Sequence, residues 1–198
     1  MGTPISPMIS LLQLIPVGVA IAWLFTMPAK GATVATVSGS STSGAIAWSI
    51  NPVNGDLMLI NASGSSTPKK LCGTINSANV EVAFSPDDKY VFVSDGGPSV
   101  GIHVTLYKRS SGLVYSAVGG IDFDLAVQRL AMEVLYGVKK LSGEVLDHSY
   151  LECTGWSKDG KRALLQLSCE GIHDGKKISI SGFKCSFDPA ALVFSTAK

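Results

Sequence analysis

Apolar and polar residues alternate along two stretches of the chain that repeat one short phrase. The sequence FSPDDK at residues 84–89 returns as WSKDGK at residues 156–161, and an apolar run follows each copy. Strict alternation is typical of a half-buried strand, and Asp favours a tight turn because its side chain bonds nearby backbone amides. Both copies therefore predict a strand, an Asp-containing turn and a second strand. Internal repetition of this kind indicates one structural unit used more than once.

Other pairs of apolar runs predict further hairpins, because each pair surrounds a short sequence rich in turn-forming residues. These pairs are residues 45–50 with 56–60, 102–107 with 113–118, and 177–187 with 191–196. Residues 61–70 and 170–175 are polar and predict loops. The first of these loops contains Asn61-Ala62-Ser63, a glycosylation sequon that has meaning only in a host with the matching enzymes.

One segment, residues 122–140, has the period of an amphipathic helix instead. Its apolar residues recur at spacings of three and four, which places them on one face; they are Phe123, Val127, Leu130, Val134 and Val138. Asp122 is a suitable N-cap, and Lys139 and Lys140 suit the negative end of the helix dipole. The segment therefore predicts one helix that packs its apolar face on the strands.

These patterns together predict an α+β fold that is mostly antiparallel β. We expect blade-like hairpins that form an open or folded-over sheet, with the amphipathic helix at about residues 122–140 packed on one face. A length of 198 residues suits one domain plus an export segment.

The N-terminal region predicts export. Residues 8–27 form an uncharged apolar run, and Ala29, Ala32 and Ala35 follow it as small residues near cleavage points. A signal peptide normally has a basic start, which this chain lacks, and the run reaches the length of about 20 residues of a membrane anchor. Both interpretations stay open: residues 1–32 are a signal peptide or an N-terminal anchor, residues 33–44 a Ser/Gly-rich linker, and residues 45–198 a single β-rich domain.

The phrases at residues 84–89 and 156–161 resemble the blade signature of WD-like and TolB-type β-propeller repeats. In those repeats an aromatic residue and Ser-Pro-Asp-Gly-Lys form the turn between two strands of a blade. The resemblance covers residues 80–118 and 150–196 and implies two blade-like units beside an N-terminal hairpin. Propellers close with about four to eight blades, so we expect no closed ring from this chain alone. The resemblance implies recognition and no particular chemistry.

Composition excludes some partners and leaves others open. The formal net charge is +1, with 16 basic and 15 acidic residues, so no basic surface for nucleic acid is expected. The four cysteines, Cys72, Cys153, Cys169 and Cys185, permit disulfides in an exported protein, with a pairing that sequence alone does not give. The other interpretation is that the cysteines are buried thiols. The wide spacing of the four cysteines along the chain disfavours a zinc site.

No catalytic motif stands out. The histidines His103, His148 and His173 are scattered, and an active site would require some of them to converge with carboxylates such as Asp147, Glu152 or Asp174. The turn residues Asp87, Asp88 and Asp159 are explained by the backbone of their turns. The aromatic residues Trp48, Phe84, Tyr107 and Trp156 suit a core better than a sugar-binding platform. We therefore expect no catalytic, cofactor or metal site.

Three hypotheses about function remain. The preferred one is an exported, periplasmic or secreted, non-catalytic protein that binds another protein or an envelope component through a sheet face or edge; membrane contact would come only from residues 8–27, if they are retained. The first alternative is a small envelope hydrolase that uses His148 with Asp147 or His173 with Asp174. The second is the remnant of a longer β-propeller, whose open sheet edges would favour aggregation.

Overall fold

The computed structural model describes residues 37–76, 78–97, 99, 101–138 and 146–196. The chain divides into two units, Met1–Lys30 and Gly31–Lys198, and every described residue belongs to the second unit. The apolar run at residues 8–27, interpreted above as a signal peptide or an anchor, lies outside the described residues. Within the described part of the chain, no helix is both long enough and apolar enough to cross a membrane.

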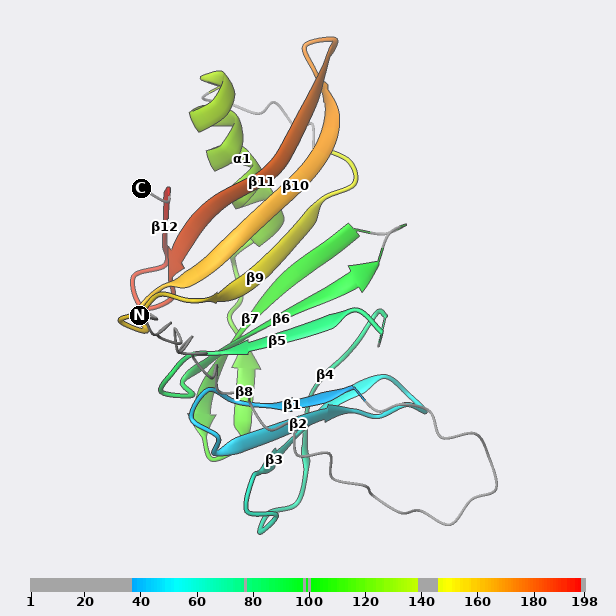
Figure 1. The fold of residues 1–198 in the computed structure, drawn as a ribbon, viewed down its shortest axis with the longest axis vertical. Helices are drawn as coiled ribbons and strands as arrows, with labels where there is room; N and C mark the ends of the chain where they lie inside the picture. Colours follow the sequence, from blue (N-terminus) through cyan, green and yellow to red (C-terminus); the bar gives the residue numbers. More distant parts are fainter. Residues whose placement is uncertain (1–36, 77, 98, 100, 139–145, 197–198) are drawn as a thin grey trace, which may run out of the picture. The chain divides into compact units, whose positions relative to one another are not determined.

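The described strands form three units, each a four-stranded antiparallel meander, which we call blades 1, 2 and 3 (Figure 1). Blade 1 comprises β1 (Ser38–Ser40), β2 (Ile46–Ile50), β3 (Asp56–Asn61) and β4 (Lys69–Gly73). Blade 2 comprises β5 (Val80–Phe84), β6 (Tyr90–Gly97), β7 (Gly101–Ser111) and β8 (Val114–Ala117). Blade 3 comprises β9 (Tyr150–Trp156), β10 (Ala163–His173), β11 (Lys176–Asp188) and β12 (Val193–Thr196).

One parallel pairing joins blades 2 and 3 into an eight-stranded sheet, whereas blade 1 is a separate sheet. Ile102 in β7 pairs with Tyr150 in β9, and the Ile102 N–H donates to the carbonyl of Ser149 at 2.9 Å. All other strand pairs are antiparallel. The fold is therefore mostly antiparallel β, open, with one helix packed on a sheet, as the sequence predicted.

The structure corrects the sequence prediction for blade 1. β1 lies in the expected linker at residues 33–44, and β4 begins in the expected loop at residues 61–70. Together they complete the N-terminal hairpin into a third blade. All three residues of β1 are exposed, and β4 starts with two exposed lysines, so neither strand carries the apolar alternation that would have revealed it.

The repeated turn occurs in all three blades, between the first and second strand. It starts at Ser41, Ser85 or Ser157, whose hydroxyl oxygen accepts a backbone N–H from the residue five positions later at 3.2, 2.9 and 3.0 Å. In blades 2 and 3 the third turn residue, Asp87 or Asp159, accepts both that serine hydroxyl and a backbone N–H. The role expected for these aspartates is confirmed.

The fourth turn residue is left-handed in every copy, with φ of +74° at Gly44, +56° at Asp88 and +70° at Gly160. Glycine adopts this region without strain, and aspartate is among the few side chains that tolerate it. The buried carboxylate of Asp88 accepts a hydrogen bond from the hydroxyl of Ser43 in the turn of blade 1. Successive turns therefore contact each other.

The helix α1 (Phe123–Tyr136) begins where its sequence predicts but ends before the predicted residue 140. The Asp122 side chain accepts the Leu125 N–H at 3.0 Å, and Gly137 ends the helix in a left-handed conformation with φ of +71°. Phe123 and Val127 are buried as predicted, and Leu130 and Val138 pack partly buried against the same cluster. Gln128, Ala131 and Met132 are also buried, which the sequence did not predict. Val134 is 52% exposed. The expected basic end at residues 139–140 lies outside the described residues.

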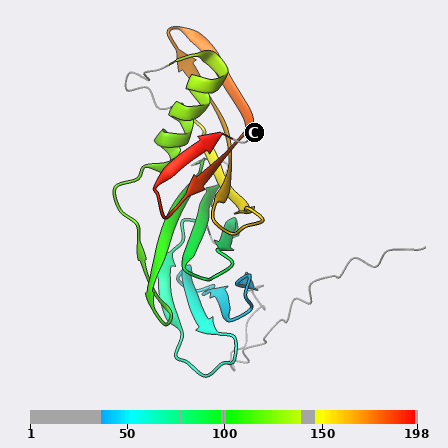
Figure 2. The same cartoon turned by 90° about the vertical axis from the view of Figure 1, so that its left-hand side faces the viewer.

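Apolar clusters fill the two junctions between successive blades. At the junction of blades 1 and 2, Ile46 and Leu59 pack with Phe84 and Val91, beside a second group that contains Leu57 and Val93. At the junction of blades 2 and 3, Phe92 and Leu106 pack with the helix and with residues of β9, β10 and β11. Figure 2 shows the helix covering one face of the sheet beside β10 and β11.

The end of β10 is a further correction. Residues 170–175 were expected to form a loop, but β10 continues to His173 and turns at Asp174 and Gly175 into β11. Residues 170–173 alternate between exposed and half-buried positions, and none of them is fully buried. They therefore lack the alternation of apolar and polar residues by which a strand is recognised in a sequence.

Candidate functional site

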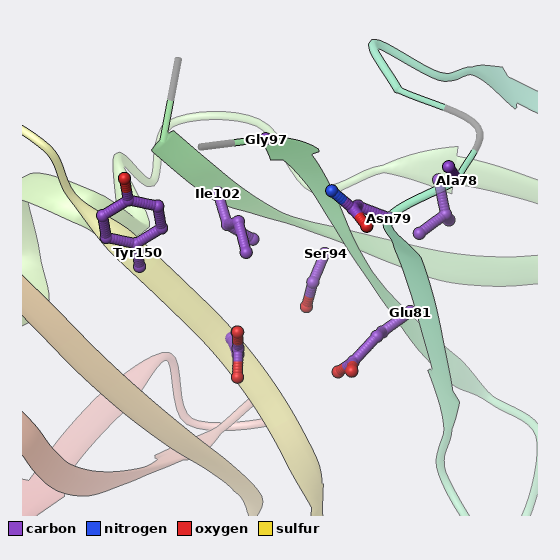
Figure 3. Close-up of a pocket in the computed structure, with 9 residues that line it drawn as sticks. Ala78, Asn79, Glu81, Ser94, Gly97, Ile102 and Tyr150 are labelled. Carbon is purple, nitrogen blue, oxygen red and sulfur yellow. The ribbon is translucent and has the colours of Figure 1, made fainter. Parts of the chain in front are cut away.

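A cleft of about 400 Å³ opens between blades 2 and 3 at the ends of β5 and β9. We call it the acidic cleft, because Glu81 from β5 and Glu152 from β9 both line it, with Asn79, Ser94 and Tyr150 among the other lining residues. In Figure 3 the side chains of Glu81 and Ser94 point into the space between blade 2 and β9. Two first strands of neighbouring blades thus supply the two carboxylates.

The electrostatics of the cleft favour a positively charged ligand. Burial and then the charge of Glu81 raise the pKa of Glu152. No lysine or arginine is among the described residues that line the cleft, and neither carboxylate forms an ion pair with a described residue. A cationic group placed between the two carboxylates would relieve their repulsion.

Ser94 fixes the floor of the cleft. Its side chain is buried, and its hydroxyl oxygen accepts the backbone N–H of Cys153 at 3.1 Å. This bond ties β6 to β9 directly below the two glutamates. The spacing of the carboxylates is therefore set by strands and not by loops, which gives a ligand a preorganised partner.

A second polar cluster lies where β7, the helix and β9 meet. One carboxylate oxygen of Asp124 accepts the hydroxyl of Ser149 at 2.9 Å, and the other lies 3.0 Å from Nδ1 of His103. The carboxylate stands between serine and histidine, whereas nucleophilic catalysis needs the histidine between serine and carboxylate. The cluster therefore joins three elements and does not have the order of a catalytic triad.

The other histidines stay apart from the cleft. His173 lies 3.5 Å from its neighbour Asp174 at the tip of the β10–β11 hairpin, and His148 follows Asp147 in the segment before β9. None of the three histidines lines the acidic cleft. Among the described residues, no group of three or more His, Cys, Asp or Glu side chains is arranged to hold a metal ion.

The four cysteines are all described and all carry free thiols. Cys153 and Cys185 both pair with Leu165, one on each side of β10, so two strand spacings of about 4.8 Å separate them. That separation exceeds the Cα distance of a disulfide, about 4.4–6.8 Å. Burial raises the pKa of Cys153 to about 12 and that of Cys185 to about 11. In this structure these thiols pack the core.

A second pocket of about 370 Å³, the turn-end pocket, lies at the other end of β5. Thr42 of blade 1, Pro86 of blade 2 and Trp156 of blade 3 line it together. The aromatic residues that the sequence placed in the core behave accordingly: Phe84 is buried, and Trp48, Tyr107 and Trp156 pack partly buried against the apolar clusters. Trp156 nevertheless presents an edge to this pocket.

Sequence reasoning missed the acidic cleft. It named Glu152 only as a partner for a histidine, and it did not single out Glu81. The signal was available in β5, where Glu81 interrupts a run of apolar residues, VEVAF, on the face opposite Val80 and Val82. The approach of β9 to β5 depends on blade packing, which no local pattern contains.

Comparison with solved structures gives a partial structural likeness. No protein-family model matches the sequence, and no curated protein matches it. Among solved structures, the putative TolB from Agrobacterium tumefaciens is similar, with a TM-score of 0.38 and 18% sequence identity. The similar region covers 82% of this chain and 45% of that protein, so the chain spans less than half its length.

Proposed function

We propose that this protein is a non-catalytic binding module whose acidic cleft holds a basic group of a partner protein. One observation carries the proposal: Glu81 and Glu152 face the same cleft, and no described lysine or arginine lines it. Glu81 is exposed and Glu152 is half-buried, so partial burial strengthens the attraction of Glu152 for a cation. Charge-assisted hydrogen bonds are the strong ones. A lysine or arginine side chain supplies both charge and donors.

We further propose that the module acts after export, in a periplasm or outside the cell. The apolar run at residues 8–27 and the small residues after it support this location. Whether a peptidase removes the run or the membrane retains it is decided by sequencing the N-terminus of the protein recovered from the producing cell. A mature start after residue 27 supports a signal peptide, and an intact start supports an anchor.

The cleft is tested with the full chain in mild detergent and a fluorescent tri-lysine peptide. We expect Glu81→Gln and Glu152→Gln each to weaken binding about tenfold, because each removes one charge-assisted hydrogen bond. Glu133→Gln, on the exposed face of the helix, is the matched control and should bind as the parent does. Equal affinity of all four proteins in a fluorescence anisotropy titration would contradict the proposed function.

A further inference from the structure

The first strand of blade 2 has a free backbone edge that runs from one pocket to the other. The Ser85 N–H donates to the carbonyl of Tyr90 at 2.9 Å, which makes this a hydrogen-bonded pair of the β5–β6 ladder. Pairing alternates in antiparallel strands, so Val80, Val82 and Phe84 direct their N–H and C=O groups away from β6. These groups form the inner edge of blade 2.

Neighbouring blades cover only the far end of this edge. The Thr42 hydroxyl of blade 1 donates to the Phe84 carbonyl at 3.1 Å, whereas the Trp156 indole of blade 3 donates at 3.4 Å to the carbonyl of Ala83, which faces β6. No hydrogen bond from a described side chain reaches the outward backbone groups of Val80 and Val82. A strand edge whose backbone groups are left without such bonds is a template for another strand.

The two pockets lie along the same strand and differ in chemistry. Glu81, at the start of β5, belongs to the acidic cleft, and Phe84 and Pro86, at its end, belong to the turn-end pocket with Trp156. The two pockets adjoin along β5, because Val82 also lines the turn-end pocket. Glu81 lies three residues from Phe84 and five from Pro86, or about 10–16 Å at 3.3 Å per residue. In an extended ligand, side chains four positions apart lie on one face at that spacing.

We propose that an extended segment of a partner protein adds to the inner edge of β5 as a further strand. Its backbone pairs with Val80 and Val82, a basic side chain enters the acidic cleft between Glu81 and Glu152, and an apolar side chain four positions away contacts Trp156. Main-chain bonds supply affinity and alternate side chains supply specificity in this mode of recognition. The inference rests on the proposed function and names the conformation and the motif of the partner.

Peptide probes test the strand pairing without altering the protein. The parent probe is the blocked heptapeptide Ser-Lys-Thr-Val-Thr-Phe-Ser, which holds Lys and Phe four positions apart. One derivative is N-methylated at Lys, Val and Phe, and the other at the two threonines. Only alternate amides of an added strand face its neighbour. We therefore expect one derivative to lose at least tenfold in affinity for the full chain and the other to bind as the parent does.

Hydrogen exchange gives the second measurement. Binding of the parent heptapeptide should slow exchange of the Val80 and Val82 amides at least tenfold, and leave the amide of exposed Val53 unchanged. Equal behaviour of the two methylated derivatives, or unchanged exchange at Val80 and Val82, would overturn strand addition. If Glu81→Gln and Glu152→Gln still weaken the tri-lysine peptide in that case, the basic-group function stands alone. If they do not, both proposals fail.

Discussion

The two junctions between blades are built from the same repeat but differ in what they leave open. At the junction of blades 1 and 2, apolar side chains such as Ile46 and Phe84 fill the contact, and the turns are joined by the bond from Ser43 to Asp88. At the junction of blades 2 and 3, the helix adds a larger apolar cluster, yet the end near Glu81 and Glu152 remains a polar cleft. The same repeated unit thus gives a filled apolar contact at one junction and leaves a polar cleft at the other.

The largest expected effect comes from breaking the apolar contact of each junction. Phe92 is fully buried and makes edge contacts with Phe123 and Phe187 at centroid distances of 5.5 and 6.3 Å. Phe92→Ala should lower the free energy of unfolding by about 3–5 kcal/mol, and Leu59→Ala at the other junction by about 2–5 kcal/mol. Urea denaturation measures both, with exposed Val53→Ala as control. A loss below about 1 kcal/mol for either variant would contradict its place in a junction core.

Two matched glycines sharpen the comparison at the turns. Gly44 and Gly160 have φ of +74° and +70°, so alanine at either position costs about 1–2 kcal/mol of strain. An added Cβ meets nothing within 4 Å at Gly44 but lies 2.9 Å from Cγ of Pro86 at Gly160. Gly160→Ala should therefore destabilise by about 1 kcal/mol more than Gly44→Ala in thermal or urea unfolding. Equal losses would show that the turns of blades 2 and 3 do not press on each other.

A smaller effect concerns pH and the acidic cleft. The raised pKa of Glu152 means that the folded protein binds its proton more tightly than the unfolded chain does. The contribution of Glu152 to the free energy of unfolding is therefore fully present below the pKa that it has in the unfolded chain. This contribution is lost as the pH rises through the pKa that Glu152 has in the folded protein. Because glutamine does not titrate, Glu152→Gln should make the free energy of unfolding depend less on pH between these two pKa values. The profile of unfolding free energy against pH for Glu133→Gln should follow the parent, and a steeper profile for Glu152→Gln would contradict the assigned direction.

The smallest effect concerns the reactivity of the cysteine thiols. Measuring it compares the burial of the two junctions without a destabilising substitution. Cys72 lies at the junction of blades 1 and 2 and is half-buried, whereas Cys153, Cys169 and Cys185 are buried at the other junction. Mass spectrometry should show four modified thiols after alkylation of the denatured, unreduced protein. In the native protein Cys72 should react first. Recovery of a disulfide-linked pair of peptides would contradict the structure.

The sequence predicts those features that local patterns encode. The alternation around Asp87 and the cap at Asp122 specify a hairpin and a helix start through bonds between near neighbours. The exposed strand β1 could not be predicted, because nothing buries its side chains. The burial of Ala131 and Met132 and the exposure of Val134 were not predicted, because packing against the strands selects the buried face.

The candidate site was harder to predict than the fold, for the same physical reason. Glu81 and Glu152 belong to different blades and meet only because blades 2 and 3 pack side by side. Ser94, which holds β6 to β9 beneath them, has no sequence signal apart from its place in an apolar strand. The histidines attracted notice as chemical residue types, although none of them lines the acidic cleft.

Asp88 shows how one deviation from a repeat can carry information about order in the series. Where its two counterparts are Gly44 and Gly160, this position has a carboxylate that reaches the preceding copy. Glycine at this position would make the three turns more alike and would at the same time remove the hydrogen bond that joins the turns of blades 1 and 2. The residue that departs from the repeat is here the one that joins two successive blades.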